Sequence, residues 1–181
     1  MENLAFLFSW IAINLIAFVC GSALGATSTG LVPYLIPGYM GLVLGDLLCG
    51  AVIGYCQWLV LKRARGFVVS PWWIAVSSVG FLIGARAGAL LTYRIAGGWL
   101  LPSIVFGVFM GGSIGFTTAW VLRHTVDFRH LPVWVAVSLV AWILGEGIAF
   151  SSGFAQAAVP QVALAIAGVT GLGLTWIRAS K

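Results

Sequence analysis

The stretch WIAVSSVGFLIGARAG at residues 73–88 occurs in related form three times in this chain of 181 residues. It aligns without gaps with WIAINLIAFVCGSALG at residues 10–25 and with WVAVSLVAWILGEGIA at residues 134–149. Each copy belongs to a long apolar run, and about 20 such residues are enough for a helix to cross a bilayer. The repeat therefore predicts three related membrane-spanning helices.

A second, weaker set of matching segments follows the first. GAVIGY at residues 50–55 aligns with GGSIGF at 111–116, and AGVTGL at 167–172 is a weaker third copy. The pattern predicts one transmembrane domain over residues 1–181, built from three tandem helix hairpins at about 4–62, 70–123 and 132–178. Because each hairpin has two spans, all three keep one orientation, and we expect a pseudo-threefold axis along the membrane normal.

The composition supports an all-α, polytopic membrane protein. Hydrophobic residues make up 61% of the chain and charged residues only 7%, with a mean hydropathy of +1.10, whereas soluble domains carry about 25% charged residues. Such a chain cannot cover a water-soluble fold, and neither a nucleic-acid partner nor a cofactor is expected. The predicted partner is the lipid bilayer. Six spans are predicted, at roughly 4–26, 40–61, 72–93, 99–122, 132–153 and 160–178.

The loop charges predict the orientation. Arg94 is the one basic residue in the loops on the side opposite the termini. The side that holds both termini carries the rest: Lys62, Arg63, Arg65, Arg123, Arg129, Arg178 and Lys181. By the positive-inside rule both termini are cytoplasmic, which predicts a multi-pass protein of the bacterial inner membrane.

Helical spacing places small and polar residues on one stripe of each repeated helix. The stripes are Asn14-Phe18-Gly21-Gly25, Ser77-Phe81-Gly84-Gly88 and Ser138-Trp142-Gly145-Ala149. Small residues let helix backbones approach closely in lipid, so packing seams are the main interpretation. A glycine-lined permeation path is the alternative.

Three ionisable residues lie well inside the predicted spans: Asp46, Arg86 and Glu146. At about 1.5 Å per residue they share a level some 20 Å from the cytoplasmic ends of their helices. Charges at this depth are costly and should face protein or water. One interpretation is an ion pair of Asp46 with Arg86, and the other is a binding site or proton relay in which Arg86 bridges both acids. Gln57 shares the stripe of Asp46, which adds it to the candidates for binding or relay, together with Asn14, Ser77 and Ser138.

Enzyme chemistry finds little support. Ser113 lies among glycines in a segment that superficially suggests a serine nucleophile, but His124 and His130 both fall in a predicted loop, so no histidine inside the membrane can act as its base. For the same reason, haem ligation inside the spans is not expected. No catalytic or metal-ligating residue is predicted. Tryptophans near span ends predict an interfacial aromatic belt: Trp10, Trp58, Trp72, Trp73, Trp99, Trp134 and Trp176. A lipophilic ligand stacked on Trp142 or Phe81 is an alternative to plain packing.

Two resemblances can be stated. The motif Gly50-x-x-x-Gly54-x-x-Gln57-Trp58 resembles one in uncharacterised bacterial multi-pass proteins built from similar hairpins, which implies the architecture and no function. In length, number of spans and cytoplasmic termini, the chain is similar to the substrate-binding subunits of energy-coupling-factor vitamin transporters. That similarity is one of architecture and implies no residue roles.

Two functions remain open from the sequence. The first is transport or binding of a small solute or ion at the charged level in the outer half of the membrane. The second is a non-catalytic accessory or assembly subunit, whose glycine and aromatic faces pack against larger membrane partners or against further copies of the chain.

Overall fold

The computed structural model describes residues 2–25, 30–95 and 98–180. Within this part the chain is all-helical, with no strand, and six of its helices are long and apolar enough to cross a membrane. The α-helices are α1 (Glu2–Leu24), α2 (Leu31–Leu35), α3 (Tyr39–Arg63), α4 (Trp72–Thr92), α5 (Leu100–Leu122), α6 (Leu131–Ser151) and α7 (Val159–Ala179). Two short 3-10 helices, η1 (Phe128–His130) and η2 (Gln156–Ala158), lead into α6 and α7. The six predicted spans are confirmed, and the protein is a multi-pass membrane protein.

The short helix α2 lies between the first and second predicted spans and was not among the predicted helices. Pro33 is the third residue of α2. The first four N–H groups of a helix have no partner inside it, so a proline there removes no helical hydrogen bond. Residue 26, at the end of the first predicted span, and Lys181 lie outside the described residues.

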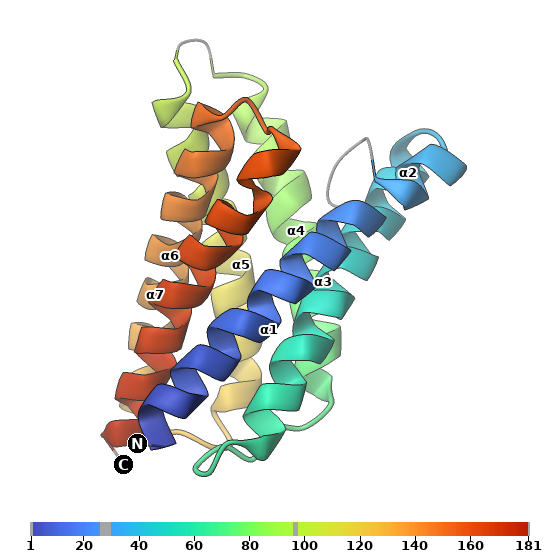
Figure 1. Ribbon diagram of the computed structural model, residues 1–181. Coiled ribbons are helices and arrows are strands. Elements are labelled where there is room, and N and C mark those ends of the chain that lie inside the picture. The colour runs from blue at the N-terminus through green and yellow to red at the C-terminus, as the bar shows by residue number, and fades with distance from the viewer. Residues whose placement is uncertain (1, 26–29, 96–97, 181) are drawn as a thin grey trace.

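The six long helices form a closed ring. Helices that follow one another along the chain pack side by side, and α7 completes the ring by packing against α1. Figure 1 shows both termini at the same end of the bundle, with α2 at the opposite end. A ring of this kind has an interior that all six helices can line.

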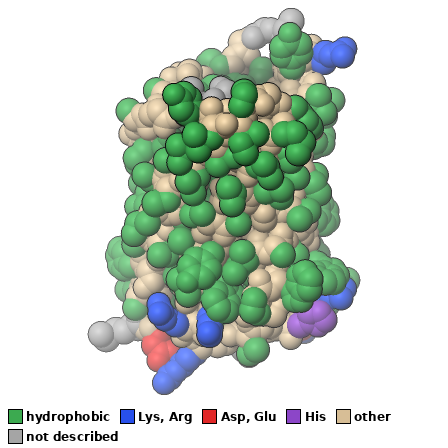
Figure 2. Space-filling view, turned by 90° about the vertical axis from the view of Figure 1, so that its right-hand side faces the viewer, with side chains coloured by type: hydrophobic (Ala, Val, Ile, Leu, Met, Phe, Trp, Pro, Cys, Tyr) green, Lys and Arg blue, Asp and Glu red, His purple; other side chains and the backbone are tan. Residues whose placement is uncertain are grey.

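Charged side chains gather at the end of the bundle that holds the termini. Figure 2 shows an apolar band across the middle of one face, basic groups mainly at one end and a single basic group at the other. Helices α3 and α7 carry their basic residues in their last turns, which lie at the terminal end. The surface is therefore divided as a bilayer requires.

Glycines bring the helix backbones into contact. On the predicted stripes, a Cβ atom added at Gly84 would lie 2.8 Å from the Cα of Met110, and glycines of α3 and α5 make similar contacts. A Cβ atom added at Gly50 would lie 2.8 Å from the Cα of Ser78, and one at Gly54 would lie 2.7 Å from the Cβ of Ser77. Gly111 makes the matching contact between α5 and α6, where an added Cβ would lie 2.6 Å from the carbonyl oxygen of Ser138. The packing seams are therefore real.

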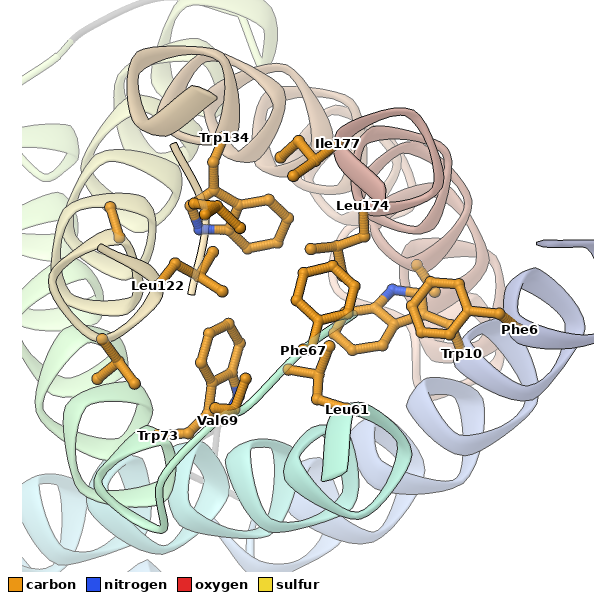
Figure 3. Close-up of a cluster of buried hydrophobic side chains, with 14 residues drawn as sticks. Phe6, Trp10, Leu61, Phe67, Val69, Trp73, Leu122, Trp134, Leu174 and Ile177 are labelled. Carbon is orange, nitrogen blue, oxygen red and sulfur yellow. The ribbon is translucent and has the colours of Figure 1, made fainter. Parts of the chain in front are cut away.

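A large apolar cluster closes the interior at the terminal end (Figure 3). The rings of Trp10, Trp73 and Trp134 point into the centre of the helix ring, and Phe67 and Val69 reach it from the α3–α4 connection. These three tryptophans are 0%, 0% and 3% exposed, so their assignment to an interfacial belt was wrong. Three others do have exposed side chains, as a belt requires: Trp72, Trp99 and Trp176.

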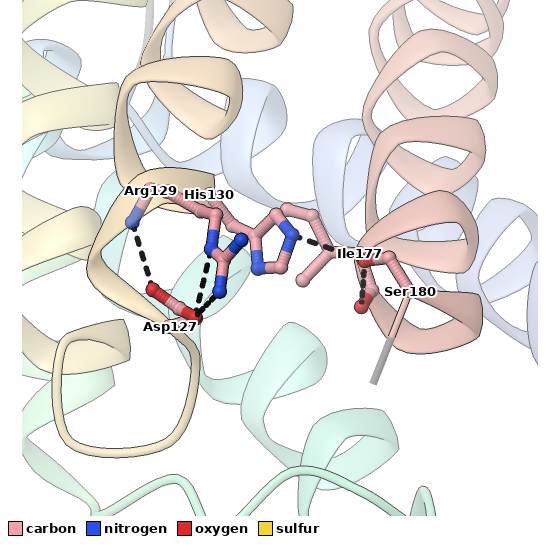
Figure 4. A network of polar contacts seen from close by, with 5 residues as sticks. All are labelled: Asp127, Arg129, His130, Ile177 and Ser180. Atoms are coloured by element: carbon pink, nitrogen blue, oxygen red, sulfur yellow. Dashed lines mark hydrogen bonds and ion pairs between the residues drawn. The ribbon is translucent and has the colours of Figure 1, made fainter.

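Polar contacts tie the elements together outside this cluster. Figure 4 shows the turn before α6, where Asp127 accepts hydrogen bonds from the backbone and side chain of Arg129. These bonds hold the pKa of Asp127 below its usual range. His130 lies 3.2 Å from the hydroxyl of Ser180, which joins this turn to the end of α7. Glu2 pairs with Arg65 and Arg178 in the same region, so the start of α1 is joined to the α3–α4 connection and to α7.

Candidate functional site

A cavity of about 140 Å³ lies inside the helix ring, in the half of the bundle away from the termini. Every one of the six long helices contributes to its lining, which also includes the exposed residues Phe154 and Gln156 of the α6–α7 connection. The cavity therefore reaches from the bundle interior to this connection. Most of the wall is apolar: Phe18, Cys49, Phe81, Phe106, Met110 and Trp142 are among its residues.

Among the described residues that line the cavity, Glu146 is the only charged one. The residue is 7% exposed, and its carboxyl group makes no hydrogen bond or ion pair with another described residue. It follows Trp142 by four residues on α6, so the carboxyl group lies one helical turn from the indole on the same face. A buried carboxyl without a partner is costly, which makes it the main functional candidate of the cavity.

Asp46 and Arg86 form an ion pair elsewhere. The Nε atom of Arg86 lies 2.6 Å from a carboxylate oxygen of Asp46, which is 1% exposed in the packed face of α3. Neither residue lines the cavity. The predicted bridge from Arg86 to both acids is therefore wrong, because within the described part of the chain Arg86 forms an ion pair with Asp46 and not with Glu146. The simpler prediction, a pair that joins α3 to α4, is confirmed.

A second, smaller cavity of about 20 Å³ lies between the first cavity and the tryptophan cluster. Gln57, Ser77 and Ser138 line it, as does Thr118. The hydroxyls of Ser77 and Ser138 are buried and make no hydrogen bond to the described residues. The space suits about one water molecule, which can bond to such hydroxyls.

Asn14 and Gln57 belong to a hydrogen-bonded chain across three helices. The amide of Gln57 donates to Asn14 over 2.8 Å, and its oxygen accepts from the indole N–H of Trp73 over 3.2 Å. Asn14 in turn donates to the carbonyl of Trp10. Each amide uses its oxygen and one of its two N–H groups in this chain, which holds α1, α3 and α4 in register. The second N–H of each amide has no partner among the described residues.

The three buried tryptophans all donate to a polar side chain on the preceding helix of the ring. Trp10 donates to Thr170 over 3.0 Å and Trp134 to Thr118 over 2.9 Å, while Trp73 uses Gln57. The pairs of Trp73 and Trp134 both span 16 residues of sequence. An indole N–H needs such a partner when it is buried, so these bonds hold neighbouring helices together at the end of the bundle that carries the termini.

An aromatic layer separates the two cavities, since Phe18, Phe81 and Trp142 line both of them. The ring of Trp142 lies 5.7 Å from that of Phe18 and 5.9 Å from that of Phe81, centroid to centroid. The two pairs are tilted and edge-to-face, which are the arrangements that aromatic rings prefer. The layer forms the floor of the large cavity.

Sequence reasoning missed several residues of the two cavities. No sequence signal beyond helix packing marked Phe106, Met110, Cys49 and Thr118. A signal did exist for Ser22 and Ala85, which occupy the same place in their repeats as Glu146. All three of these aligned residues line the large cavity. No protein-family model, curated protein or solved structure matches this chain.

Proposed function

We propose that this protein binds a small solute in the cavity of Glu146 and carries it into or across the membrane. The observation that supports this function is one buried carboxyl group with no partner among the described residues, in a cavity to which all six long helices contribute. Charged groups inside a membrane are kept at a cost and usually serve a site. Apolar walls with a few placed polar groups are typical of small-molecule sites.

The proposal includes an orientation in the bacterial inner membrane. The basic residues lie at the end that holds the termini, which favours a cytoplasmic location for that end. The large cavity then faces the outside, and the tryptophan cluster closes the cytoplasmic end. A solute would enter beside the α6–α7 connection and rest on the aromatic layer.

The accessory-subunit function stays as the second candidate because of two glycines. A Cβ atom added at Gly147 of α6 or at Gly168 of α7 would meet no atom within 4 Å. Open space beside a glycine can accept a helix of another protein. In that case the Asp46–Arg86 pair would serve only to clamp two helices, and the cavity would be filled or covered in the complex.

Purification in mild detergent, followed by mass measurement and identification of every component, separates the two candidates. Recovery as a monomer or small homo-oligomer agrees with the solute-binding proposal. Stoichiometric recovery with larger membrane subunits contradicts it.

Uptake or binding of a panel of small solutes in proteoliposomes is the functional test. It compares the native protein with Glu146→Gln and with Glu2→Gln, a matched change of an exposed carboxylate at the far end. We expect Glu146→Gln alone to reduce the signal. Equal signals from all three proteins would refute the role of Glu146.

A further inference from the structure

We infer that the ligand of the Glu146 cavity is a small organic monocation with a flat apolar body, of the arylalkylamine (benzylamine-like) class. This inference rests on the proposed function and adds the chemical class of the solute. Three features of the cavity carry it: its charge, its walls and its size.

The charge of the cavity is unbalanced. Among the described residues, Arg86 of α4 is the one Lys or Arg that lies inside a long helix away from its last turn, and it is paired with Asp46 outside the cavity. Glu146 is therefore the only charged side chain that a ligand would meet in the described lining of the cavity. A buried carboxylate needs a partner of opposite charge or several hydrogen bonds, and a ligand ammonium group supplies both. Ser22 and Gln156, which also line the cavity, offer oxygen atoms for the remaining N–H groups.

The walls favour a ligand with an apolar, preferably aromatic, body. Phe18, Phe81 and Trp142 form the floor, and Phe106 adds a fourth ring to the lining. Aromatic faces attract organic cations, most strongly when the site is desolvated. A ligand ammonium group beside Glu146 would thus lie one helical turn from Trp142, with its apolar part on the aromatic layer.

The size and the donor set argue against a metal ion. Calcium and magnesium need about six oxygen ligands, whereas the described residues contain no group of three or more side chains suited to hold a metal. The cavity measures about 140 Å³. A cavity of about 150 Å³ with apolar walls is known to accept benzene, so a single substituted ring fits the space.

The test is binding of benzylammonium and benzyl alcohol to the full-length protein in lipid nanodiscs, measured by calorimetry with empty nanodiscs subtracted. The two probes have nearly the same shape and differ in charge. The native protein is compared with Glu146→Gln, which keeps the shape of the side chain without its charge. A further variant, Ala149→Phe, fills the cavity from another lining residue and leaves Glu146 in place.

We expect benzylammonium to bind the native protein at least about tenfold more tightly than Glu146→Gln, as for other buried charge pairs. Ala149→Phe should abolish binding of both probes, and benzyl alcohol should bind weakly and without regard to residue 146. If both probes bind equally to the native protein and to Glu146→Gln, while Ala149→Phe blocks them, the cavity is a solute site and the inferred cation class is wrong. If neither probe binds, or Ala149→Phe has no effect, the proposed site is itself refuted.

Discussion

The Nε atom of Arg86 lies 2.6 Å from a carboxylate oxygen of Asp46, and both residues lie outside the cavity that holds Glu146. The three charges inside the bundle thus divide into a neutral pair that joins two helices and one acid with no partner among the described residues. On this account the Asp46–Arg86 pair contributes to stability, whereas Glu146 serves ligand binding. Variants of the two groups should therefore have different effects.

Arg86→Met should destabilise the fold because it leaves Asp46 buried and unpaired. Loss of one partner of a buried pair costs about 3–5 kcal/mol, which thermal unfolding in detergent would detect. The double variant Asp46→Asn/Arg86→Met removes both charges and should recover most of the loss. Native stability in Arg86→Met would show that the pair contributes nothing.

The glycine seam between α5 and α6 can be tested with two adjacent glycines. Gly111→Ala places a methyl group 2.6 Å from the carbonyl oxygen of Ser138, and such overpacking costs about 1–3 kcal/mol. Gly112→Ala is the matched control, because its nearest neighbour would be a methyl carbon of Leu139 at 3.7 Å. The control should be neutral or slightly stabilising, since alanine favours a helix. The same loss in both variants would contradict the packing described for this seam.

The indole bond of Trp134 should be measurable on its own. Thr118→Val keeps the shape of the side chain but leaves the buried N–H of Trp134 without its acceptor at 2.9 Å. We expect a loss of about 1–3 kcal/mol in the free energy of unfolding. Thr118→Ser retains the hydroxyl and should lose much less. If serine and valine are equivalent here, the bond has no energetic role.

The aromatic layer should control access to the second, smaller cavity. Ser138 lines this smaller cavity. With the three native cysteines replaced by alanine, a cysteine introduced by Ser138→Cys therefore reports whether a reagent reaches the smaller cavity. A membrane-impermeant thiol reagent should label it slowly while Trp142 is present and faster in Trp142→Ala, which opens the floor of the large cavity. Trp120→Ala, on the exposed surface of α5, is the control and should leave the rate unchanged. An unchanged rate in Trp142→Ala would exclude the layer as the barrier.

The spans could be predicted from the sequence because a long apolar run has few alternatives in a membrane protein. The direction of individual side chains was harder. Trp10 and Trp73 lie near span ends, where an interfacial position and a buried one share the same sequence signal. Each of them lies four residues before the polar residue of its stripe, Asn14 or Ser77, and this spacing was the available sign that they face inward.

The predicted repeat also contained a sign that Arg86 and Glu146 face different parts of the bundle. Arg86 follows Ala85 directly, and neighbouring residues of a helix point about 100° apart. Ala85 aligns with Glu146 and lines the cavity, whereas Arg86 does not. Arg86 and Glu146 were placed at one level by their distance from the helix ends. Equal depth does not show that two side chains point to the same place, because that depends on their position around the helix axis. The threefold symmetry of the bundle stays a prediction, to which the matched bonds of Trp73 and Trp134 lend support.

The most direct test of the solute site is to locate a ligand in it. Crystals of the protein grown in a lipidic phase with 4-bromobenzylammonium would reveal the bromine by its anomalous scattering. We predict one strong peak inside the helix ring beside Phe81 and Trp142, with the ammonium group in contact with the carboxylate of Glu146, and no such peak in Glu146→Gln. A peak only at the lipid-facing surface, or an equal peak in both proteins, would contradict the account.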